Sequence, residues 1–283
     1  MYALGVAIDA TLITLVLALA AFGLAIIFGL IGVINMGHGA MLTAGAYITW
    51  VCQTNGVPFL LAVLVAAVAV AVIGLVLEHV LIRHFYDRPF ETLLLTWAFF
   101  LITTEVIKII FGPEFRSVTN PLPDAITIGG IHVPAYRAAV ALFALALIVT
   151  SAVVLYRTSL GIKIRGLIQN RQMAALLGLN IGLTYKLVFM AGCFMAGLAG
   201  GLITPMLSID PYIGNVYLVR SFFVVAVGGV GQLLGGTMIG SFLIGGSETI
   251  FAVVSEQAVA QTIVFALAIL VLRLRPRGVL TPR

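Results

Sequence analysis

Positive charge is absent from the first part of the chain, where no Lys or Arg precedes Arg83. Charged residues make up only 9% of the 283 residues, against about a quarter in soluble domains. Hydrophobic residues make up 62%, more than a soluble domain of this length could bury. The composition therefore predicts one integral membrane domain over residues 1–283 and no soluble catalytic domain. The net charge of +5 does not indicate nucleic-acid binding, because the basic residues lie in short loops beside apolar runs.

Other absences narrow the possible functions. The chain has only two cysteines, Cys52 and Cys193, which lie in different apolar runs and are expected to be apolar fillers rather than a disulfide. It has no Gly-x-x-x-x-Gly-Lys-Ser/Thr loop, so it is not expected to hydrolyse ATP. It also lacks the His-Glu-x-x-His and Gly-x-Ser-Gly strings of intramembrane enzymes. No enzyme activity, metal or cofactor is expected, and no basic region typical of a cleaved signal peptide stands at the N-terminus.

What the chain does have is a series of apolar runs. A helix needs about 20 apolar residues to cross the hydrocarbon, and two of the runs, 39–53 and 216–231, are short, so their full crossing is left open. The pattern predicts an all-α, polytopic membrane bundle with eight or nine membrane segments. The nine candidate runs are 10–31, 39–53, 58–82, 92–112, 138–156, 184–206, 216–231, 234–252 and 257–273.

Basic residues set the expected orientation, since cytoplasmic loops are enriched in Lys and Arg. Three groups hold 11 of the 15 basic residues and are expected inside. The N-terminus is then outside and the C-terminus inside, which requires an odd number of crossings. The remaining four, Lys108, Arg116, Arg137 and Arg220, are expected outside or near the outer face. The inner groups are Arg83 and Arg88; Arg157, Lys163, Arg165, Arg171 and Lys186; and Arg273, Arg275, Arg277 and Arg283.

Two further patterns concern connections and packing. The expected external loop 113–137 holds four of the ten prolines, and residues 126–128 and 131–133 are predicted to pair as a hairpin around Gly129-Gly130. This loop either caps the outer mouth or contacts an external partner. Small residues recur every four positions at Gly192, Ala196 and Gly200, and again at Gly236 and Gly240, which predicts close helix packing.

A polar break separates the first two apolar runs. Asn35 and His38 stand there, in the stretch Asn35-Met36-Gly37-His38-Gly39. Polar groups at membrane depth are costly and commonly mark functional sites. Either these two side chains face a polar interior, or they simply hydrogen-bond a neighbouring helix.

The expected inner connection 157–183 is the second informative segment. One short helix is predicted from Ile164 to Leu177, ending at Gly178. Such a helix lies on lipid headgroups or docks into a groove on an inner partner. Its expected apolar face is Leu167, Ile168, Ala174 and Leu177, and its expected wet face is Arg165, Gln169 and Arg171.

Four ordered motifs resemble permease subunits of the branched-chain amino acid ABC importer family, over a stretch from about residue 20 to the tail 275–278. A related branch of that family takes urea and short amides. Segments 169–174 and 223–229 are similar to that branch, whereas 176–178 is similar to the amino-acid branch, so the solute stays open between them. The four motifs are 29–39 with 45–47, 174–180, 196–201, and 227–231 with 234–236.

The resemblance implies a half-channel in the bacterial cytoplasmic membrane, surrounded by lipid, that moves branched-chain amino acids; urea or a short amide is the alternative solute. It implies a second permease subunit, two cytoplasmic ATPase subunits and an external, periplasmic solute-binding protein as partners. It also implies that segment 159–180 is the coupling helix. The residues expected to couple to the ATPase are Gly161, Arg165, Gln169, Arg171, Ala174 and Gly178.

Within such a permease, Asn35 and His38 are the leading candidates for the substrate pathway. Glu105 and Glu248 complete the set. Glu105 lies three residues before Lys108, so its carboxylate either pairs with Lys108 or contacts the solute. Glu248 lies within an apolar run, where an unpaired carboxylate is costly. Arg220 is expected to contact the binding protein or a lipid headgroup. The expected external mouth is Asp210, Tyr212, Asn215 and Tyr217.

Other transport classes compete with this interpretation. An ion-coupled secondary transporter would recruit His38, Glu105 and Glu248 as its ion or proton site, and it would stop when the proton gradient collapses. A passive channel is disfavoured, because the chain has no Asn-Pro-Ala pair and no Thr-Val-Gly-Tyr-Gly filter.

Overall fold

The chain forms a bundle of helices with one small hairpin. The computed structural model describes residues 2–86, 88–128 and 131–280. Helices dominate because in lipid a helix satisfies its backbone groups within the segment. The α-helices are α1 (Tyr2–Ile31), α2 (His38–Thr54), α3 (Phe59–Val80), α4 (Pro89–Phe111), α5 (Ala135–Arg157), α6 (Ser159–Gln169), α7 (Arg171–Leu176), α8 (Ile181–Ile203), α9 (Ile213–Gly228), α10 (Gly235–Ser241), α11 (Ser247–Phe251) and α12 (Gln257–Leu274). Short 3-10 turns η1 (Ile82–His84) and η2 (Thr204–Met206), the π-helical turn η3 (Phe242–Gly246) and strands β1 (Ala125–Ile128) and β2 (Ile131–Pro134) complete the fold.

Six helical segments are long and apolar enough to cross a membrane, which confirms a polytopic helical membrane protein. The described ranges thus contain six full-length spans, and the eight or nine membrane segments expected from the sequence stay a prediction. The other three apolar runs are nevertheless helical: α2 has 17 residues, α9 has 16, and the run 234–252 is divided into α10, η3 and α11. The six spans are Leu4–Ile31, Phe59–His84, Pro89–Phe111, Ala135–Arg157, Ile181–Met206 and Gln257–Leu274.

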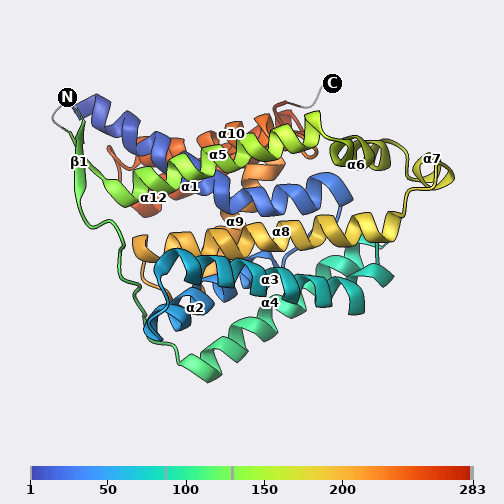
Figure 1. Cartoon of the computed structure of the whole chain (residues 1–283). Coiled ribbons are helices and arrows are strands. Elements are labelled where there is room, and N and C mark those ends of the chain that lie inside the picture. The colour runs from blue at the N-terminus through green and yellow to red at the C-terminus, as the bar shows by residue number, and fades with distance from the viewer. Residues whose placement is uncertain (1, 87, 129–130, 281–283) are drawn as a thin grey trace.

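Helix α8 lies in the middle of the bundle, packed against α1, α2 and α3 (Figure 1). The predicted stripe of small residues makes this possible, since a Cβ at Gly192 would collide with Ile27 of α1 and one at Gly200 with the carbonyl of Leu42 in α2. Gly240 meets the backbone of Val224 in α9 in the same way. The prediction of close packing at these glycines is confirmed.

The two expected loops lie at opposite ends of the bundle. In Figure 1, α6 and α7 lie at the right-hand end and β1 at the left-hand end. Strands β1 and β2 pair in antiparallel register, with Ile126 opposite Val133, as predicted; the expected turn at Gly129-Gly130 lies outside the described residues. At the α6–α7 end, Lys186 at the start of α8 approaches His79 of α3, with 3.2 Å between Nζ and Nδ1.

The inner segment differs from the single helix predicted over Ile164–Leu177. It forms two helices, α6 and α7, that meet at Asn170. The side chain of Asn170 accepts a hydrogen bond from the Met173 amide at 2.9 Å and so caps α7. Sequence periodicity did not find this break because the capping residue lies inside a continuous helical pattern. The predicted stop is confirmed: Gly178 follows α7 with a φ of +79°, a conformation that favours glycine.

Large apolar side chains cover the outside of the bundle. Leu60 of α3, Phe90 and Ile109 of α4, and Leu142 of α5 are 77%, 82%, 80% and 68% exposed in the isolated chain. A surface of this kind is covered by lipid or by another protein. Inside, Cys193 is buried against Gly74 and both cysteines are free thiols, in keeping with their expected role as apolar fillers.

Candidate functional site

The break between α1 and α2 lies inside the bundle. Helix α1 ends at Ile31, Gly32 turns the chain with a φ of +78°, and α2 begins at His38. The Nε2 atom of His38 lies 2.8 Å from the carbonyl oxygen of Ala20. Ala20 precedes the end of α1 by about 16 Å of helix, at 1.5 Å per residue. The chain after α1 therefore turns back into the bundle, and α2 starts at the level of Ala20 rather than at the end of α1.

Asn35 is buried in this break without a partner. Its side chain is 1% exposed, and neither amide atom has a hydrogen bond in the part of the chain that is described. The neighbouring backbone is satisfied, because the Met36 amide donates to Thr96 Oγ1 of α4 at 3.1 Å. An unpaired buried polar group costs about 1–3 kcal/mol. The Asn35 amide is thus positioned to donate to and accept from a water or a solute.

His38 is in a different situation. Its Nε2 bonds the neighbouring helix α1, as the structural alternative predicted, while Nδ1 has no partner among the described residues. Because the Ala20 carbonyl only accepts, Nε2 carries the proton in the neutral ring and Nδ1 is an acceptor. One side of the imidazole therefore anchors α2, and the other is available to a donor.

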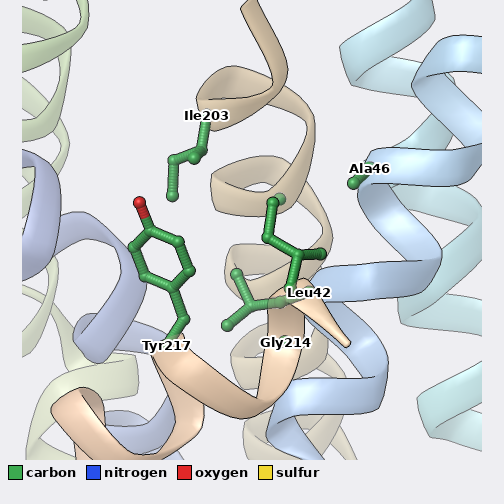
Figure 2. A pocket seen from close by; sticks show the side chains of 7 residues that line it. Leu42, Ala46, Ile203, Gly214 and Tyr217 are labelled. Carbon is green, nitrogen blue, oxygen red and sulfur yellow. The ribbon is translucent and has the colours of Figure 1, made fainter. Parts of the chain in front are cut away.

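The start of α9 meets the start of α2. A Cβ at Gly39 or Gly214 would collide with the backbone of the other residue, and the Gly214 amide donates to Thr43 Oγ1 at 3.1 Å. Helix N-termini carry partial positive charge, so two such ends converge in the interior. Figure 2 shows the small pocket beside them, with Tyr217 pointing toward Ile203 and Leu42 to the side of the tyrosine ring. The pocket is apolar and has room for about one water molecule; it is lined by Leu42, Ala46, Gly200, Ile203, Ile213, Gly214 and Tyr217.

The other interior candidate, Glu248, is paired. Arg220 Nη2 donates to Glu248 Oε1 at 2.7 Å, with side-chain exposures of 18% and 8%. Arg220 was expected to face a headgroup or an external protein, but it lies in the middle of α9 and turns toward α11. The π-helical turn η3 immediately precedes the helix that carries Glu248, and such turns are common at functional sites.

The remaining pathway and mouth candidates are spread out. Glu105 pairs with Lys108 on the surface of α4, at 3.0 Å between Oε1 and Nζ, and its side chain is 57% exposed. Asp210 is half-buried, Tyr212 and Asn215 are exposed, and Tyr217 lies deeper, in the pocket of Figure 2. Glu105 is therefore exposed on α4, whereas Asn35 and Glu248 are buried.

The coupling candidates divide between packed and exposed positions. Gly161 is buried against the backbone of Leu155 at the end of α5, and Ala174 is 3% exposed in a cluster with Leu167 and Tyr185. Arg165 lies over the Tyr156 ring at 5.2 Å, and Gly178 is exposed. The side chains of Gln169 and Arg171 lie outside the described residues. The predicted apolar face is thus split, because Leu177 is 76% exposed while Leu167 is buried.

Sequence reasoning missed Glu78 of α3. This carboxylate is 1% exposed, its Oε1 accepts from the Tyr86 hydroxyl at 2.7 Å, and Oε2 has no hydrogen bond within the described ranges. Tyr86 packs edge-on against Tyr185, which also contacts Leu167 of α6. The available signal was a single acidic residue within the apolar run 58–82.

A multi-spanning bundle with a helix break and buried polar groups is typical of membrane transport proteins. The family model described as "Branched-chain amino acid transport system / permease component" matches residues 6–272. The chain therefore belongs to this permease family, which is not a catalytic one.

Named relatives agree with this assignment. The chain is 26% identical over 281 residues to the high-affinity branched-chain amino acid transport system permease protein BraD of Pseudomonas aeruginosa, covering 93% of this chain and 91% of the relative. LivH of Escherichia coli K12, of the same description, is also 26% identical, covering 93% and 90%. A probable LivH of Methanocaldococcus jannaschii is 32% identical over 96 residues, covering 34% and 30%. No solved structure matches the chain.

Proposed function

We propose that this chain is the membrane-spanning permease subunit of an ATP-driven ABC importer that moves branched-chain amino acids across the bacterial cytoplasmic membrane. The observation that carries the proposal is the family match over residues 6–272. The transport systems named for BraD and LivH are branched-chain amino acid systems. None of the relatives reported above is named for urea or amides, which leaves that alternative without support.

The proposed topology has nine crossings, with the N-terminus outside and the C-terminus inside, in one domain that covers the chain. Its support is that the basic groups gather at one end. Lys186 meets His79 there, and the tail joins the end of α9 through Val279, whose amide donates to the Val227 carbonyl at 2.8 Å. In this topology α2 runs outward from the interior and α9 runs inward, so each short helix completes a crossing together with its preceding loop.

The proposed substrate pathway runs past Asn35 and His38. Broken helices at mid-membrane expose polar backbone and side-chain groups to a solute, and Asn35 has two such unused groups. Glu248 borders the pathway through its pair with Arg220. Glu105 belongs to it only where a second permease subunit covers α4, since this chain leaves the Glu105–Lys108 pair exposed. Asp210, Tyr212 and Asn215 form the mouth, with Tyr217 below them.

The proposed coupling site is the α6–α7 segment, which two cytoplasmic ATPase subunits would move. Its support is an unpartnered apolar tip: Leu176 and Leu177 are 82% and 76% exposed next to buried Ala174. An exposed leucine pair on a short helix suits a groove on a partner. Differential contact with the two states of the ATPase would transmit closure to the bundle. An external binding protein delivers the solute at the opposite end.

Uptake into vesicles tests the proposal. The permease pair, ATPase subunits and cognate binding protein are reconstituted with ATP inside, and radiolabelled leucine, urea and a short amide are compared. Leucine uptake that requires ATP and survives collapse of the proton gradient is expected. Uptake by the permease without its ATPase, or uptake lost with the gradient while ATP is maintained, contradicts the proposal and favours a secondary transporter.

A further inference from the structure

At the end of the bundle opposite α6 and α7, an arginine is held against aromatic rings. Arg116 and Ile209 form a short antiparallel bridge, with backbone N–O distances of 2.8 and 2.7 Å. The Arg116 guanidinium lies 5.2 Å from the centre of the Trp50 ring, and its Nη2 donates to the Phe111 carbonyl at 3.0 Å. Phe111 and Trp50 both pack on Tyr47, with ring centroids 5.2 and 6.3 Å from the Tyr47 ring.

Two polar atoms in this group have no partner. Tyr47 is 2% exposed, and its hydroxyl makes no hydrogen bond within the described chain. The Nε atom of Arg116 is likewise buried and unpaired. A phenylalanine at position 47 would keep the ring contacts and avoid burying an unpaired hydroxyl. The hydroxyl therefore indicates a partner that the isolated chain does not supply.

A charge of opposite sign lies beside Arg116. Asp210 follows Ile209, the backbone partner of Arg116, and the charges of Asp210 and Arg116 both act on the Tyr47 hydroxyl. The two side chains form no ion pair with each other in the described ranges. Asp210 Oδ1 accepts from the Tyr212 amide at 2.6 Å, while Arg116 reaches Glu114 at 3.4 Å, and that carboxylate is 76% exposed.

We propose that this outer cluster (Tyr47, Trp50, Phe111, Arg116 and Asp210) binds the zwitterionic head of a free apolar α-amino acid at the mouth. The solute carboxylate accepts from the Tyr47 hydroxyl and from Arg116 Nε, and its ammonium group lies at Asp210. The aromatic rings form an apolar wall for the aliphatic side chain. A carboxylic acid would bring no cation to Asp210, an amine would bring no acceptor to the Tyr47 hydroxyl and Arg116 Nε, and urea has neither charge. The inference rests on the proposed importer function and specifies its cargo.

Removal of the Tyr47 hydroxyl tests the inference. Tyr47→Phe is compared with wild type in the complete importer, reconstituted with ATP and saturating leucine-loaded binding protein. Leucine uptake per folded complex is expected to fall about tenfold, because a hydrogen bond to a charged group is lost. The melting temperature of the purified complex is expected to stay the same or rise. Wild-type uptake by Tyr47→Phe overturns the inference.

A matched control and a second variant separate the outcomes. Tyr136→Phe also removes a buried tyrosine hydroxyl, but one that donates to the Leu202 carbonyl at 2.6 Å, so it is expected to lower the melting temperature and leave uptake per folded complex unchanged. Asp210→Asn keeps the acceptor for the Tyr212 amide but removes the charge, and is expected to weaken retention of radiolabelled leucine by the importer at least fivefold. Unchanged retention overturns the role of Asp210. Absence of leucine uptake in the wild type refutes the importer function itself, which is a separate result.

Discussion

The two interior polar regions of this bundle are built in opposite ways. At the α1–α2 break, the neutral amide of Asn35 is buried with no partner among the described residues, whereas the charges of Arg220 and Glu248 pair across α9 and α11 at 2.7 Å. A neutral polar group left unpaired costs far less than an unpaired charge in a medium of low dielectric constant. The comparison teaches that a neutral side chain can be kept available for a solute, whereas charges at this depth must be held as a pair.

Breaking the charged pair is expected to have the largest effect. Glu248→Leu leaves the Arg220 guanidinium buried without its carboxylate, which costs about 3–5 kcal/mol of stability. The double variant Arg220→Leu/Glu248→Leu removes both charges and is expected to recover most of that loss. The measurement is the melting temperature and yield of the purified permease complex. A loss in the double variant equal to the sum of the losses in Glu248→Leu and Arg220→Leu would show that the pair is not energetically coupled.

The same double variant also decides what the pair does in transport. If uptake per folded complex is normal, Arg220 and Glu248 only join α9 to α11. If stability recovers and uptake is lost, the pair borders the pathway as proposed.

A variant of the coupling segment is expected to lose transport while the permease stays folded, so it serves as a reference for the interior variants. Leu176→Ser removes an 82% exposed apolar side chain, and burying a leucine at an interface is worth about 1.5–3 kcal/mol. ATPase subunits are therefore expected to copurify with at least tenfold lower affinity, while the permease keeps its melting temperature. Arg165→Glu with Arg171→Glu is expected to weaken the same assembly, through charge. Normal copurification and uptake in both variants would remove the coupling role of α6–α7.

Removing the unpaired amide is the direct counterpart of breaking the pair. Asn35→Leu keeps the number and branching of the side-chain heavy atoms and leaves no partner behind, so stability is expected to stay the same or to rise by about 1–3 kcal/mol. Uptake is expected to fall about tenfold with normal ATPase copurification. His38→Leu loses the bond to Ala20 and is expected to cost about 1 kcal/mol of stability as well as uptake. Normal uptake by Asn35→Leu would leave Asn35 as a tolerated structural defect.

Sequence patterns predicted the parts of this fold that depend on local chemistry. The apolar runs predicted the helices, and the run that was expected to start at residue 39 begins one residue earlier, as α2 at His38. The spacing of Gly192, Ala196 and Gly200 predicted the packing of α8. These features follow from the solubility of each segment in lipid and from side-chain size, both of which are properties of the segment alone.

Partnerships across the fold could not be predicted in this way. Arg220 and Glu248 are 28 positions apart, and nothing in either neighbourhood specifies the other. The contacts of Arg116 with Ile209 and Trp50 depend on how the loop after α4 folds over the bundle. The depth of Tyr217 likewise depends on where α9 begins, which the packing of Gly214 on Gly39 determines.

In its hydrogen bonding, Glu78 is intermediate between Asn35 and the Arg220–Glu248 pair, and a variant of its partner Tyr86 is expected to have the smallest effect. One of its oxygens accepts from Tyr86, and the other has no hydrogen bond in the described chain. Tyr86→Phe is expected to cost about 1 kcal/mol, the value of a typical hydrogen bond, measured as a shift in melting temperature. In a Glu78→Leu background the same change should cost less, because this acceptor is gone. Equal costs in both backgrounds would mean that the Tyr86 hydroxyl is stabilised by a group other than Glu78, and Glu78 would then resemble unpaired Asn35 more than paired Glu248.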